Sequence, residues 1–200
     1  MCSFRDPLKP FLILITFGAL LAQGVHAQNT SGESSYFPLA VGNTWTYKCS
    51  VEGEFQGLKK FDIAGVTQTK GTQVFSLEMR LSNKQKPLVS YLFVTPEGLV
   101  MRALSATLED AKPLISVAPK LGQRFGDLKV VKVGRSDIKK YAKVKTVFLE
   151  NYSAEAPGLS QEQYWAWRGK HYGRGIGLLV EADGAGGDCE LTSYRVKSAK

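Results

Sequence analysis

The chain has 200 residues, 44% of them hydrophobic, and a formal net charge of +8 at pH 7. It contains only two histidines and three cysteines. A zinc site needs three or four His, Cys or carboxylate ligands, and a Ser-His-Asp triad needs a well-placed histidine. The composition therefore argues against zinc enzymes and serine hydrolases, and we expect no cofactor and no metal.

The N-terminal segment has the pattern of an export signal. Arg5 and Lys9 form a basic head, residues 11–22 are an apolar run, and residues 25–27 offer a small-residue cleavage pattern. The apolar run is about a dozen residues long, whereas a membrane-spanning helix needs about 20. We predict that residues 1–27 are a signal peptide and that the protein is periplasmic or secreted, with a retained membrane anchor as the alternative.

Removal of the signal leaves about 173 residues, the size of one ordinary domain. Residues 28–36 are mostly small and polar and predict a flexible leader. Residues 37–200 predict a single β domain, and no later segment is long and apolar enough to cross a membrane.

The domain opens with "FPLAVGNTWTYKC", which places Trp45, Tyr47 and Cys49 on alternate positions after a Pro, a Gly and an Asn. Such a stretch fits either the lip of a ligand site or the start of a β-sheet. Alternation with a period of two predicts a strand, and it continues along the chain. Further strands are predicted over Lys59–Val66, Phe75–Leu81, Leu88–Thr95, Gly98–Leu104, Leu128–Val133, Tyr141–Glu150, Gln161–Arg168, Gly175–Ala182 and Glu190–Val196.

Two of these elements differ from the rest. The run "LVSYLFVT", Leu88–Thr95, is apolar on both faces and predicts a central strand. Ser105–Ala111, ended by Pro113, is the best candidate for a helix, with Ser105 as its N-cap. Many short strands joined by turns predict a mainly β fold, a curled antiparallel sheet in a half-barrel or open barrel, with at most one or two short helices.

A short motif occurs twice. Residues 41–45 and 121–125 share an apolar residue, a glycine, an amide side chain, any residue and an aromatic ring. Glycine permits the turn backbone, the amide can bond back to the chain, and the ring can fill the end of a core. The motif predicts strand-initiating turns, and it is a weak indication of internal duplication.

Cys2 lies in the signal, so Cys49 and Cys189 remain in the mature chain. Two cysteines in an oxidising compartment usually pair. One lies in the first predicted strand and the other opens the last, which suits a disulfide between neighbouring strands. The alternative is a pair of unbonded, buried thiols.

His171 is the mature chain's single histidine, because His26 falls in the signal. Its turn-like surroundings predict an exposed loop residue or one stacked on Tyr172. The glycines of Gly173–Gly177 predict a tight turn between strands, because a strand and not a helix follows them, unlike in a phosphate-binding loop.

Sugar hydrolysis needs two neighbouring carboxylates. Glu150, Glu155, Glu162 and Glu181 lie on or near predicted strands, but nothing in the sequence brings two of them together, so we assign no catalytic residue. Glu162 is the first to test, since flanking aromatic rings could desolvate it and raise its pKa.

Aromatic residues are densest around Trp165 and Trp167, between Tyr164 and Tyr172. Together with Trp45, these two tryptophans are our candidate ligand-binding residues, as the wall of an apolar cavity. The alternative is that their rings are ordinary core.

Basic residues concentrate in Lys129–Lys145. Such a stripe attracts phosphate groups, but the chain shows no recognition helix or base-stacking motif, so we expect no nucleic-acid partner. Anionic lipid or an envelope polymer remains open. A solvated lysine face that protects a sheet edge is the favoured interpretation.

The two ends of the domain resemble a diffuse group of uncharacterised exported bacterial proteins, with a Pro-Leu-x-x-Gly-Asn-x-Trp-x-Tyr opening and a late Tyr-Trp followed by Gly-[Val/Ile]-Gly-Leu. The matching positions are Pro38, Leu39, Gly42, Asn43, Trp45, Tyr47, Tyr164, Trp165, Gly175, Ile176, Gly177 and Leu178. The resemblance implies a curled antiparallel sheet similar to the half-barrels of lipoprotein carriers. It implies no activity and no catalytic residues, and "WAWRGKHYG" departs from the shorter link expected there.

These observations favour an exported, non-enzymatic binding module for a lipid, a lipidated protein or another hydrophobic ligand of the cell envelope. A structural or adhesion-type domain that binds an envelope protein is the first alternative. A polysaccharide hydrolase that uses Glu162 is the second.

Overall fold

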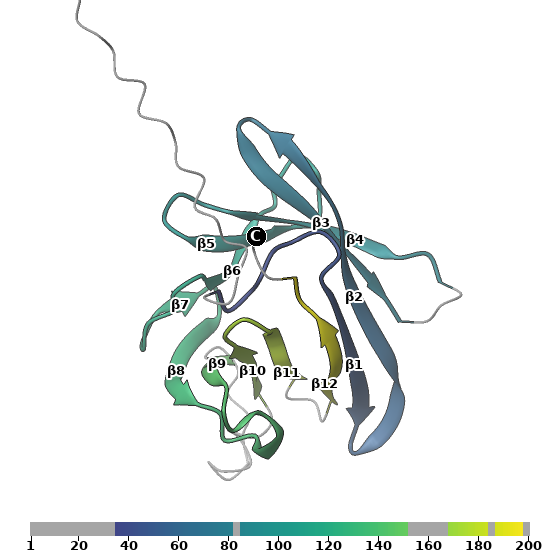
Figure 1. Ribbon diagram of the computed structural model, residues 1–200, viewed down its shortest axis with the longest axis vertical. Helices are drawn as coiled ribbons and strands as arrows, with labels where there is room; N and C mark the ends of the chain where they lie inside the picture. The colour runs from purple at the N-terminus through teal and green to yellow at the C-terminus, as the bar shows by residue number, and fades with distance from the viewer. Residues whose placement is uncertain (1–34, 82–84, 152–167, 184–186, 198–200) are drawn as a thin grey trace, which may run out of the picture.

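The computed structural model describes residues 35–81, 85–151, 168–183 and 187–197 (Figure 1). These residues form one antiparallel sheet that curls until it nearly closes into a barrel. The predicted fold class is confirmed. Ser35 and Tyr36, the last two residues of the predicted leader, are buried against the domain.

Within the described residues the sheet has twelve strands and there is one short 3₁₀ helix. The elements are β1 (Thr44–Val51), β2 (Glu54–Thr69), β3 (Thr72–Arg80), β4 (Leu88–Val94), β5 (Leu99–Ala103), β6 (Lys112–Ser116), β7 (Arg124–Phe125), β8 (Leu128–Arg135), η1 (Lys139–Tyr141), β9 (Lys145–Asn151), β10 (Arg168–Gly173), β11 (Gly177–Asp183) and β12 (Gly187–Arg195).

The strand order is β6-β5-β4-β3-β2-β1-β12-β11-β10-β9-β8-β7. Consecutive strands therefore lie side by side, except for β6 and β7, which form the two edges of the sheet. In addition, β1 pairs with β12 and so joins the first and last strands. The edge strands β6 and β7 follow one another in sequence and also lie near each other in space. This proximity brings the two edges of the curled sheet together and leaves an interior between them.

The alternation in β1 sorts its side chains as predicted. Trp45 and Tyr47 are buried, whereas Lys48, which follows them, is exposed. Successive side chains of a strand point to opposite faces, so one face of β1 lines the interior of the barrel and the other faces solvent.

The predicted helix over Ser105–Ala111 is wrong, because this segment forms turns. The Asp110 carboxylate accepts the backbone N–H groups of Leu104 at 2.8 Å and Ser105 at 3.2 Å. Asp side chains compete for backbone donors in this way, and a segment of seven residues is too short to offset the cost of helix nucleation.

The predicted strand over Leu88–Thr95 is present as β4, which is paired on both sides, with β3 and with β5. Strand β4 lies third from the β6 edge, and its first two residues, Leu88 and Val89, are 63% and 41% exposed. Leu92, deeper in the strand, is fully buried. The apolar run therefore starts on the surface and enters the core only in its second half.

The two copies of the glycine–amide motif form matching turns. Gly42 has a φ of +89° and Gly122 a φ of +82°, a left-handed region that favours glycine. The Gly42 N–H donates to the Ile63 carbonyl and the Gly122 N–H to the Val130 carbonyl, both at 2.8 Å. In each copy the turn is thus bonded to the partner of the strand that it starts, β2 in the first copy and β8 in the second.

The amide side chains and rings of the motif also behave as predicted. Asn43 donates to the Pro38 carbonyl at 3.0 Å, and the Gln123 side chain accepts the Lys120 N–H at 3.0 Å. The rings of Trp45 and Phe125 are each 3% exposed. The motif therefore starts a strand in both places, β1 and β7.

The likeness extends to the segments that precede these turns. The Gly175 N–H, between β10 and β11, donates to the Ser35 carbonyl, and the Val117 N–H donates to the carbonyl of Gly98, between β4 and β5, both at 2.8 Å. The segment before each set of six strands thus packs on a hairpin of the other set. This reciprocity supports an internal duplication into β1–β6 and β7–β12.

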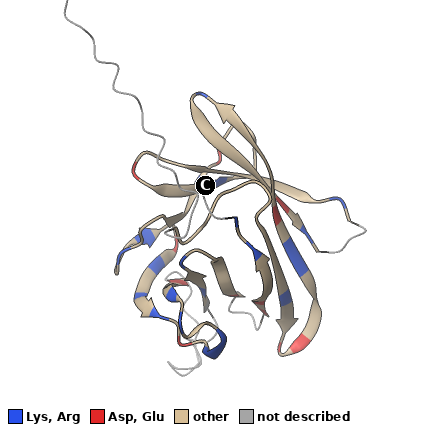
Figure 2. Cartoon of the chain, in the orientation of Figure 1, with Lys and Arg blue, Asp and Glu red and all other residues tan. Residues whose placement is uncertain are grey.

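Strand β8 carries the basic stripe along an open edge. Strand β7 and the turn before it pair only with Leu128–Val130, so among the described residues β8 has no strand partner on that side beyond Val130. Lys and Arg, drawn blue in Figure 2, follow β8 and the turn after it. Charged residues on an edge discourage pairing with another chain, which agrees with the favoured interpretation of this stripe.

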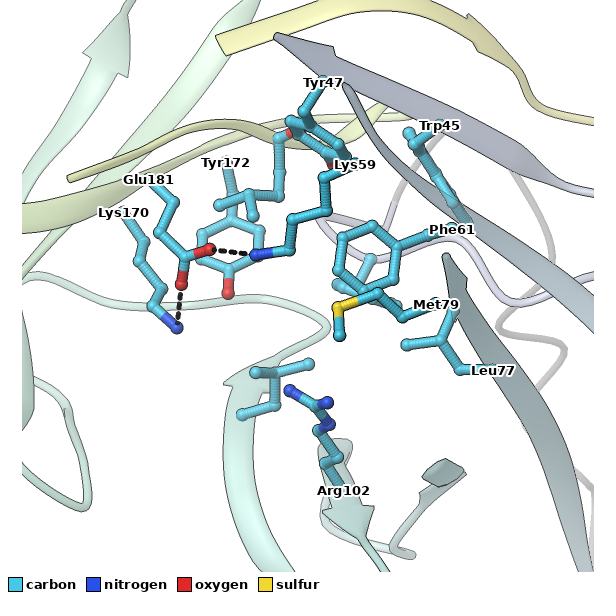
Figure 3. A pocket seen from close by; sticks show the side chains of 13 residues that line it. Trp45, Tyr47, Lys59, Phe61, Leu77, Met79, Arg102, Lys170, Tyr172 and Glu181 are labelled. Atoms are coloured by element: carbon cyan, nitrogen blue, oxygen red, sulfur yellow. Dashed lines mark hydrogen bonds and ion pairs between the residues drawn. The ribbon is translucent and has the colours of Figure 1, made fainter. Parts of the chain in front are cut away.

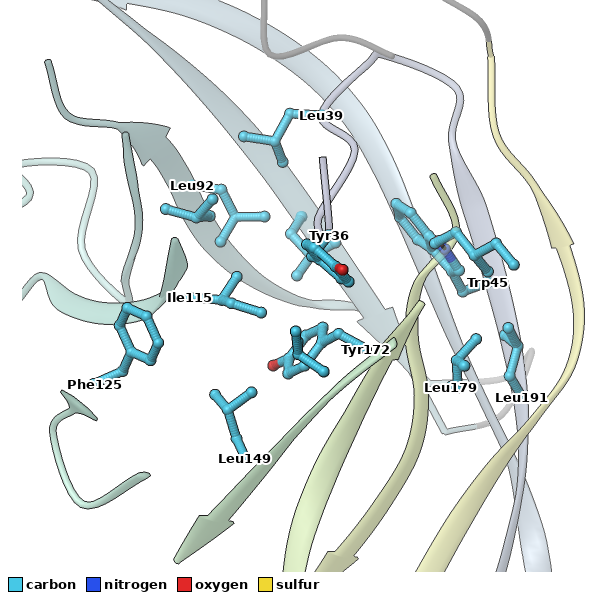
Figure 4. Close-up of a cluster of buried hydrophobic side chains, with 14 of the residues drawn as sticks. Tyr36, Leu39, Trp45, Leu92, Ile115, Phe125, Leu149, Tyr172, Leu179 and Leu191 are labelled. Carbon is cyan, nitrogen blue, oxygen red and sulfur yellow. Dashed lines mark hydrogen bonds between the residues drawn. The ribbon is translucent and has the colours of Figure 1, made fainter. Parts of the chain in front are cut away.

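A tightly packed region fills much of the interior (Figure 4). It contains residues from both sets of six strands. Many of its members are fully buried. They include Leu39, Ile63, Leu92, Val100, Ile115, Val130, Val147, Leu149, Leu179 and Leu191.

The predicted disulfide is present. Cys49 of β1 lies opposite Cys189 of β12, with 4.0 Å between their Cα atoms. The bridge therefore ties together two adjacent strands from opposite ends of the described chain, with 140 residues between the two cysteines.

Candidate functional site

A pocket of about 100 Å³ lies in the part of the interior that the packed region does not fill (Figure 3). Its walls come from seven strands of both sets and from the segment before β1. They are Phe37, Trp45, Tyr47, Lys59, Phe61, Leu77, Met79, Arg102, Leu114, Lys170, Tyr172, Leu178 and Glu181.

Aromatic rings form the wall nearest β1 and β2. Phe37 lies 6.0 Å from Trp45, centroid to centroid, and Tyr47 meets Phe61 edge to face at 5.7 Å. Such pairs hold rings at fixed angles. This wall is therefore apolar and rigid.

Hydrogen bonds hold the polar atoms of two of these rings. The Trp45 indole N–H donates to the Ile176 carbonyl, and the Tyr47 hydroxyl donates to the Leu178 carbonyl at 2.9 Å. Both acceptors lie at or near the start of β11. The rings therefore offer the pocket their carbon faces and keep no free donor for a ligand.

The opposite wall is charged. Glu181 forms ion pairs with Lys170 at 2.8 Å and with Lys59 at 3.2 Å, and these three side chains are between 21% and 27% exposed. Burial raises the pKa of Glu181, but the two lysines outweigh burial and bring that pKa to about 2. Glu181 is therefore a carboxylate at neutral pH, shared by two cations.

Arg102 of β5 points into the pocket from the far side (Figure 3). Its Nε donates to the Ser90 hydroxyl at 3.2 Å. In the described part of the chain it forms no ion pair with a carboxylate. The planar guanidinium thus keeps its two terminal nitrogens available to the pocket.

The Tyr172 hydroxyl, from β10, also borders the pocket. Its side chain is 1% exposed, and burial raises its pKa, so the hydroxyl stays protonated. This hydroxyl neither donates nor accepts a hydrogen bond among the described residues. A buried polar group without a partner is rare in proteins, and this one borders a hollow.

A second opening of about 340 Å³ adjoins the pocket and shares Lys59 and Glu181 with it. The Cys49–Cys189 disulfide forms part of its wall. The ion pair between Lys59 and Glu181 thus separates the inner pocket from this wider opening.

The candidate ligand-binding residues fall in two places. Trp45 lines the pocket, as the alternation in β1 predicted. Trp165 and Trp167 lie outside the described residues, so the predicted cluster around them stays a prediction.

The carboxylates considered for hydrolysis do not meet as a pair among the described residues. Glu181 faces the interior beside Lys170. Glu150 lies opposite Gly169, the residue before Lys170 in β10, and so points to the outer face. Burial raises the pKa of Glu150. Glu155 and Glu162 lie outside the described residues.

His171 is not in a loop and does not stack on Tyr172, so both predictions for it were wrong. It lies within β10, and its ring stacks on Phe148 of β9 at 4.3 Å. Alternation puts His171 and Tyr172 on opposite faces of the strand. The glycines of Gly173–Gly177, by contrast, form the predicted turn between β10 and β11.

Sequence reasoning missed the charged wall. Lys59 alternates with exposed positions and shares its face with Phe61 and Ile63, and Arg102 shares its face with Val100. A charged residue at an apolar position of an alternating strand points inward. That signal was present in the sequence and could have identified both cations.

No protein-family model matches the chain, and a search of curated proteins finds no match. The resemblance to exported bacterial proteins therefore stays a prediction. Among the residues that the structure describes, no helix is long and apolar enough to cross a membrane. In the same part of the chain, no cluster of three or more His, Cys, Asp or Glu side chains could hold a metal ion.

Proposed function

We propose that the protein is an exported, non-enzymatic binding module that takes up a hydrophobic or amphipathic small molecule, such as a lipid, in the pocket inside its barrel. The observation that carries this proposal is a hollow with an aromatic and aliphatic wall beside a charged one, in an interior that is elsewhere tightly packed. Ligand sites are typically concave and apolar, with a few convergent polar groups.

The size of the pocket limits what enters it. Pockets for drug-sized ligands measure about 300–1,000 Å³, whereas this one measures about 100 Å³. It accommodates one end of an elongated molecule, a few carbon atoms long. The remainder of such a ligand would lie toward the adjoining opening of about 340 Å³.

Filling the pocket tests the proposal. Leu114→Trp places a larger ring in the hollow, and Leu104→Trp, at a position 71% exposed, is the matched control. We expect the parent chain and Leu104→Trp to retain a co-purified lipid, detected by mass spectrometry, and to displace an environment-sensitive dye when lipid is added. Leu114→Trp should do neither. Equal ligand content in all three proteins would refute the pocket as the site.

The alternative, a protein-interaction domain, has one observation in its favour. Phe55 and Leu58 of β2 are 58% and 54% exposed, and exposed apolar side chains are common in interfaces. If this alternative holds, Phe55→Ser combined with Leu58→Ser should abolish capture of a protein from envelope extract. The same change should leave dye binding in the pocket unaltered.

A further inference from the structure

We infer that the pocket selects an anionic amphiphile, whose head group binds between Arg102, Tyr172 and Lys170 while its first carbon atoms contact Phe61 and Met79. This inference rests on the proposed function and adds the chemical class of the ligand. It follows from the charges and donors that the fold turns inward, beginning with Arg102.

Arg102 is the strongest element of the site. Ser90 holds its Nε at 3.2 Å and so orients the guanidinium, which points into the hollow (Figure 3). A guanidinium presents two parallel N–H groups that match a carboxylate or a phosphate. Because the described residues supply no carboxylate to Arg102, a ligand anion would supply the missing charge.

The charge balance of the pocket also favours an anion. Lys59, Lys170 and Arg102 line the hollow, and Glu181 is the single carboxylate among the lining residues. Glu181 already binds both lysines, so the lining as a whole carries a surplus of positive charge. Like charges in a partly buried site repel one another, and an anion relieves that repulsion.

The Tyr172 hydroxyl supplies a neutral donor. It is buried and protonated, and it has no partner in the described part of the chain. The Arg102 guanidinium and the Glu181 carboxylate line the same hollow as this hydroxyl. An anionic oxygen there would accept this hydrogen bond, whereas an alkyl group would leave it unmade.

The apolar side of the hollow fixes the other half of the ligand. Phe61 and Met79 stand across from Lys170 and Glu181 (Figure 3). The flexible Met79 thioether adapts to an alkyl chain, and the Phe61 ring offers that chain a flat apolar surface. A molecule that is charged at one end and apolar next to it is complementary to both sides of the pocket.

A matched series of ten-carbon amphiphiles tests the inference by isothermal titration calorimetry with the full mature chain at neutral pH. The probes are decanoate, decyl phosphate, decanol and decylammonium, which share a tail and differ in head group. We expect decanoate or decyl phosphate to bind at least about tenfold more tightly than decanol, a difference typical of one charged hydrogen-bonded contact. The tighter of the two anions identifies the head group. Decylammonium should bind most weakly.

Variants locate the source of the selectivity. Arg102→Met and Tyr172→Phe should each reduce the preference for the anion toward one, because the anion loses more affinity than decanol does. Arg102→Lys should retain part of the preference for the anion. Each variant is first shown to have the parent's far-ultraviolet circular dichroism and cooperative unfolding, and Tyr172→Phe keeps the buried ring, so it tests the hydroxyl alone.

The outcomes separate the two proposals. Equal affinity for decanoate, decyl phosphate and decanol would overturn the anionic head group and leave the hydrophobic site standing. Failure of all four probes to bind would overturn both. Selectivity that survives in Arg102→Met and Tyr172→Phe alike would show that the anion binds elsewhere.

Discussion

The interior of this barrel contains two regions that share several strands, among them β2, β5 and β11. The packed region holds side chains such as Leu149 and Val147 that are 0% exposed. The pocket, by contrast, is bordered by the charged side chains of Lys59, Arg102 and Glu181. Inward charges cannot interdigitate as aliphatic groups do, because each must keep a polar partner or water. The hollow thus lies where four strands carry ionic residues on their apolar face, namely Lys59, Arg102, Lys170 and Glu181.

The largest expected effect concerns the disulfide beside the hollow. Removing it by Cys49→Ala with Cys189→Ala should lower the free energy of unfolding by about 5 kcal/mol, because the bridge closes a loop of 140 residues. Chemical denaturation of the parent and the double variant measures this. Reductant should destabilise the parent alone, and equal midpoints for the two proteins would contradict the prediction.

The next effect compares truncations in the two regions directly. Leu149→Ala should cost about 2–5 kcal/mol, because it leaves a new cavity among fully buried neighbours. Met79→Ala should cost only about 1 kcal/mol, because it enlarges a hollow that already exists. Urea unfolding of both variants provides the test, and equal losses would mean that the pocket is packed like the rest of the core.

Because of the charged wall, the free energy of unfolding should decrease at acidic pH. Two lysines bring the pKa of Glu181 to about 2, from an ordinary 4.5, against the opposing effect of burial. A lowered folded-state pKa stabilises the protein above pH 4.5, and this contribution is lost as the pH falls toward 2. We expect Glu181→Gln to cost about 1–3 kcal/mol at neutral pH.

The matched control for that experiment is Glu190→Gln, which removes an ion pair with Lys140 whose two side chains are each 48% exposed. It should change the free energy of unfolding by less than about 1 kcal/mol. Denaturation curves between pH 7 and pH 2 compare the variants. A gap between the parent and Glu181→Gln that stays constant over this range would show that Glu181 does not titrate as described.

The smallest effect lies on the outer face of the same strands. Burial against Phe148 lowers the pKa of His171, a shift that the Asp137 carboxylate opposes and Lys132 supports. A histidine whose pKa is lowered in the folded state costs the fold nothing above its ordinary pKa of 6.5. Stability falls as the pH drops below 6.5, because the unfolded chain then binds the proton more readily. His171→Phe should therefore flatten the stability profile between pH 7 and pH 5. A slope unchanged from the parent's would contradict this.

Local patterns in the sequence predicted much of the fold. Alternation sorted Trp45 and Tyr47 to the interior, and the repeated glycine–amide motif predicted two turns that proved to share their hydrogen bonds. The pattern failed at Ser105–Ala111, where a single carboxylate, Asp110, captures the backbone donors. A period of two is set by neighbouring residues, which explains why it can be read without knowledge of the tertiary structure.

The candidate site could be predicted only in part. Trp45 was found because it begins a strand, and the face occupied by Lys59 and Arg102 could have been read in the same way. That Arg102 of β5 and Tyr172 of β10 border one hollow could not, because their strands never pair and meet only through the curl of the sheet. Contacts across a barrel depend on its closure, and no local pattern encodes which strands face each other.

The most direct test of the account is a crystal structure of the mature chain with 2-bromodecanoate, whose bromine sits next to the carboxylate and can be located by anomalous scattering. We predict one bromine position inside the barrel, beside the Arg102 guanidinium and the Tyr172 hydroxyl, with the alkyl chain leading past Met79. Bromine found only on the outer surface, with the hollow filled by water, would contradict the account.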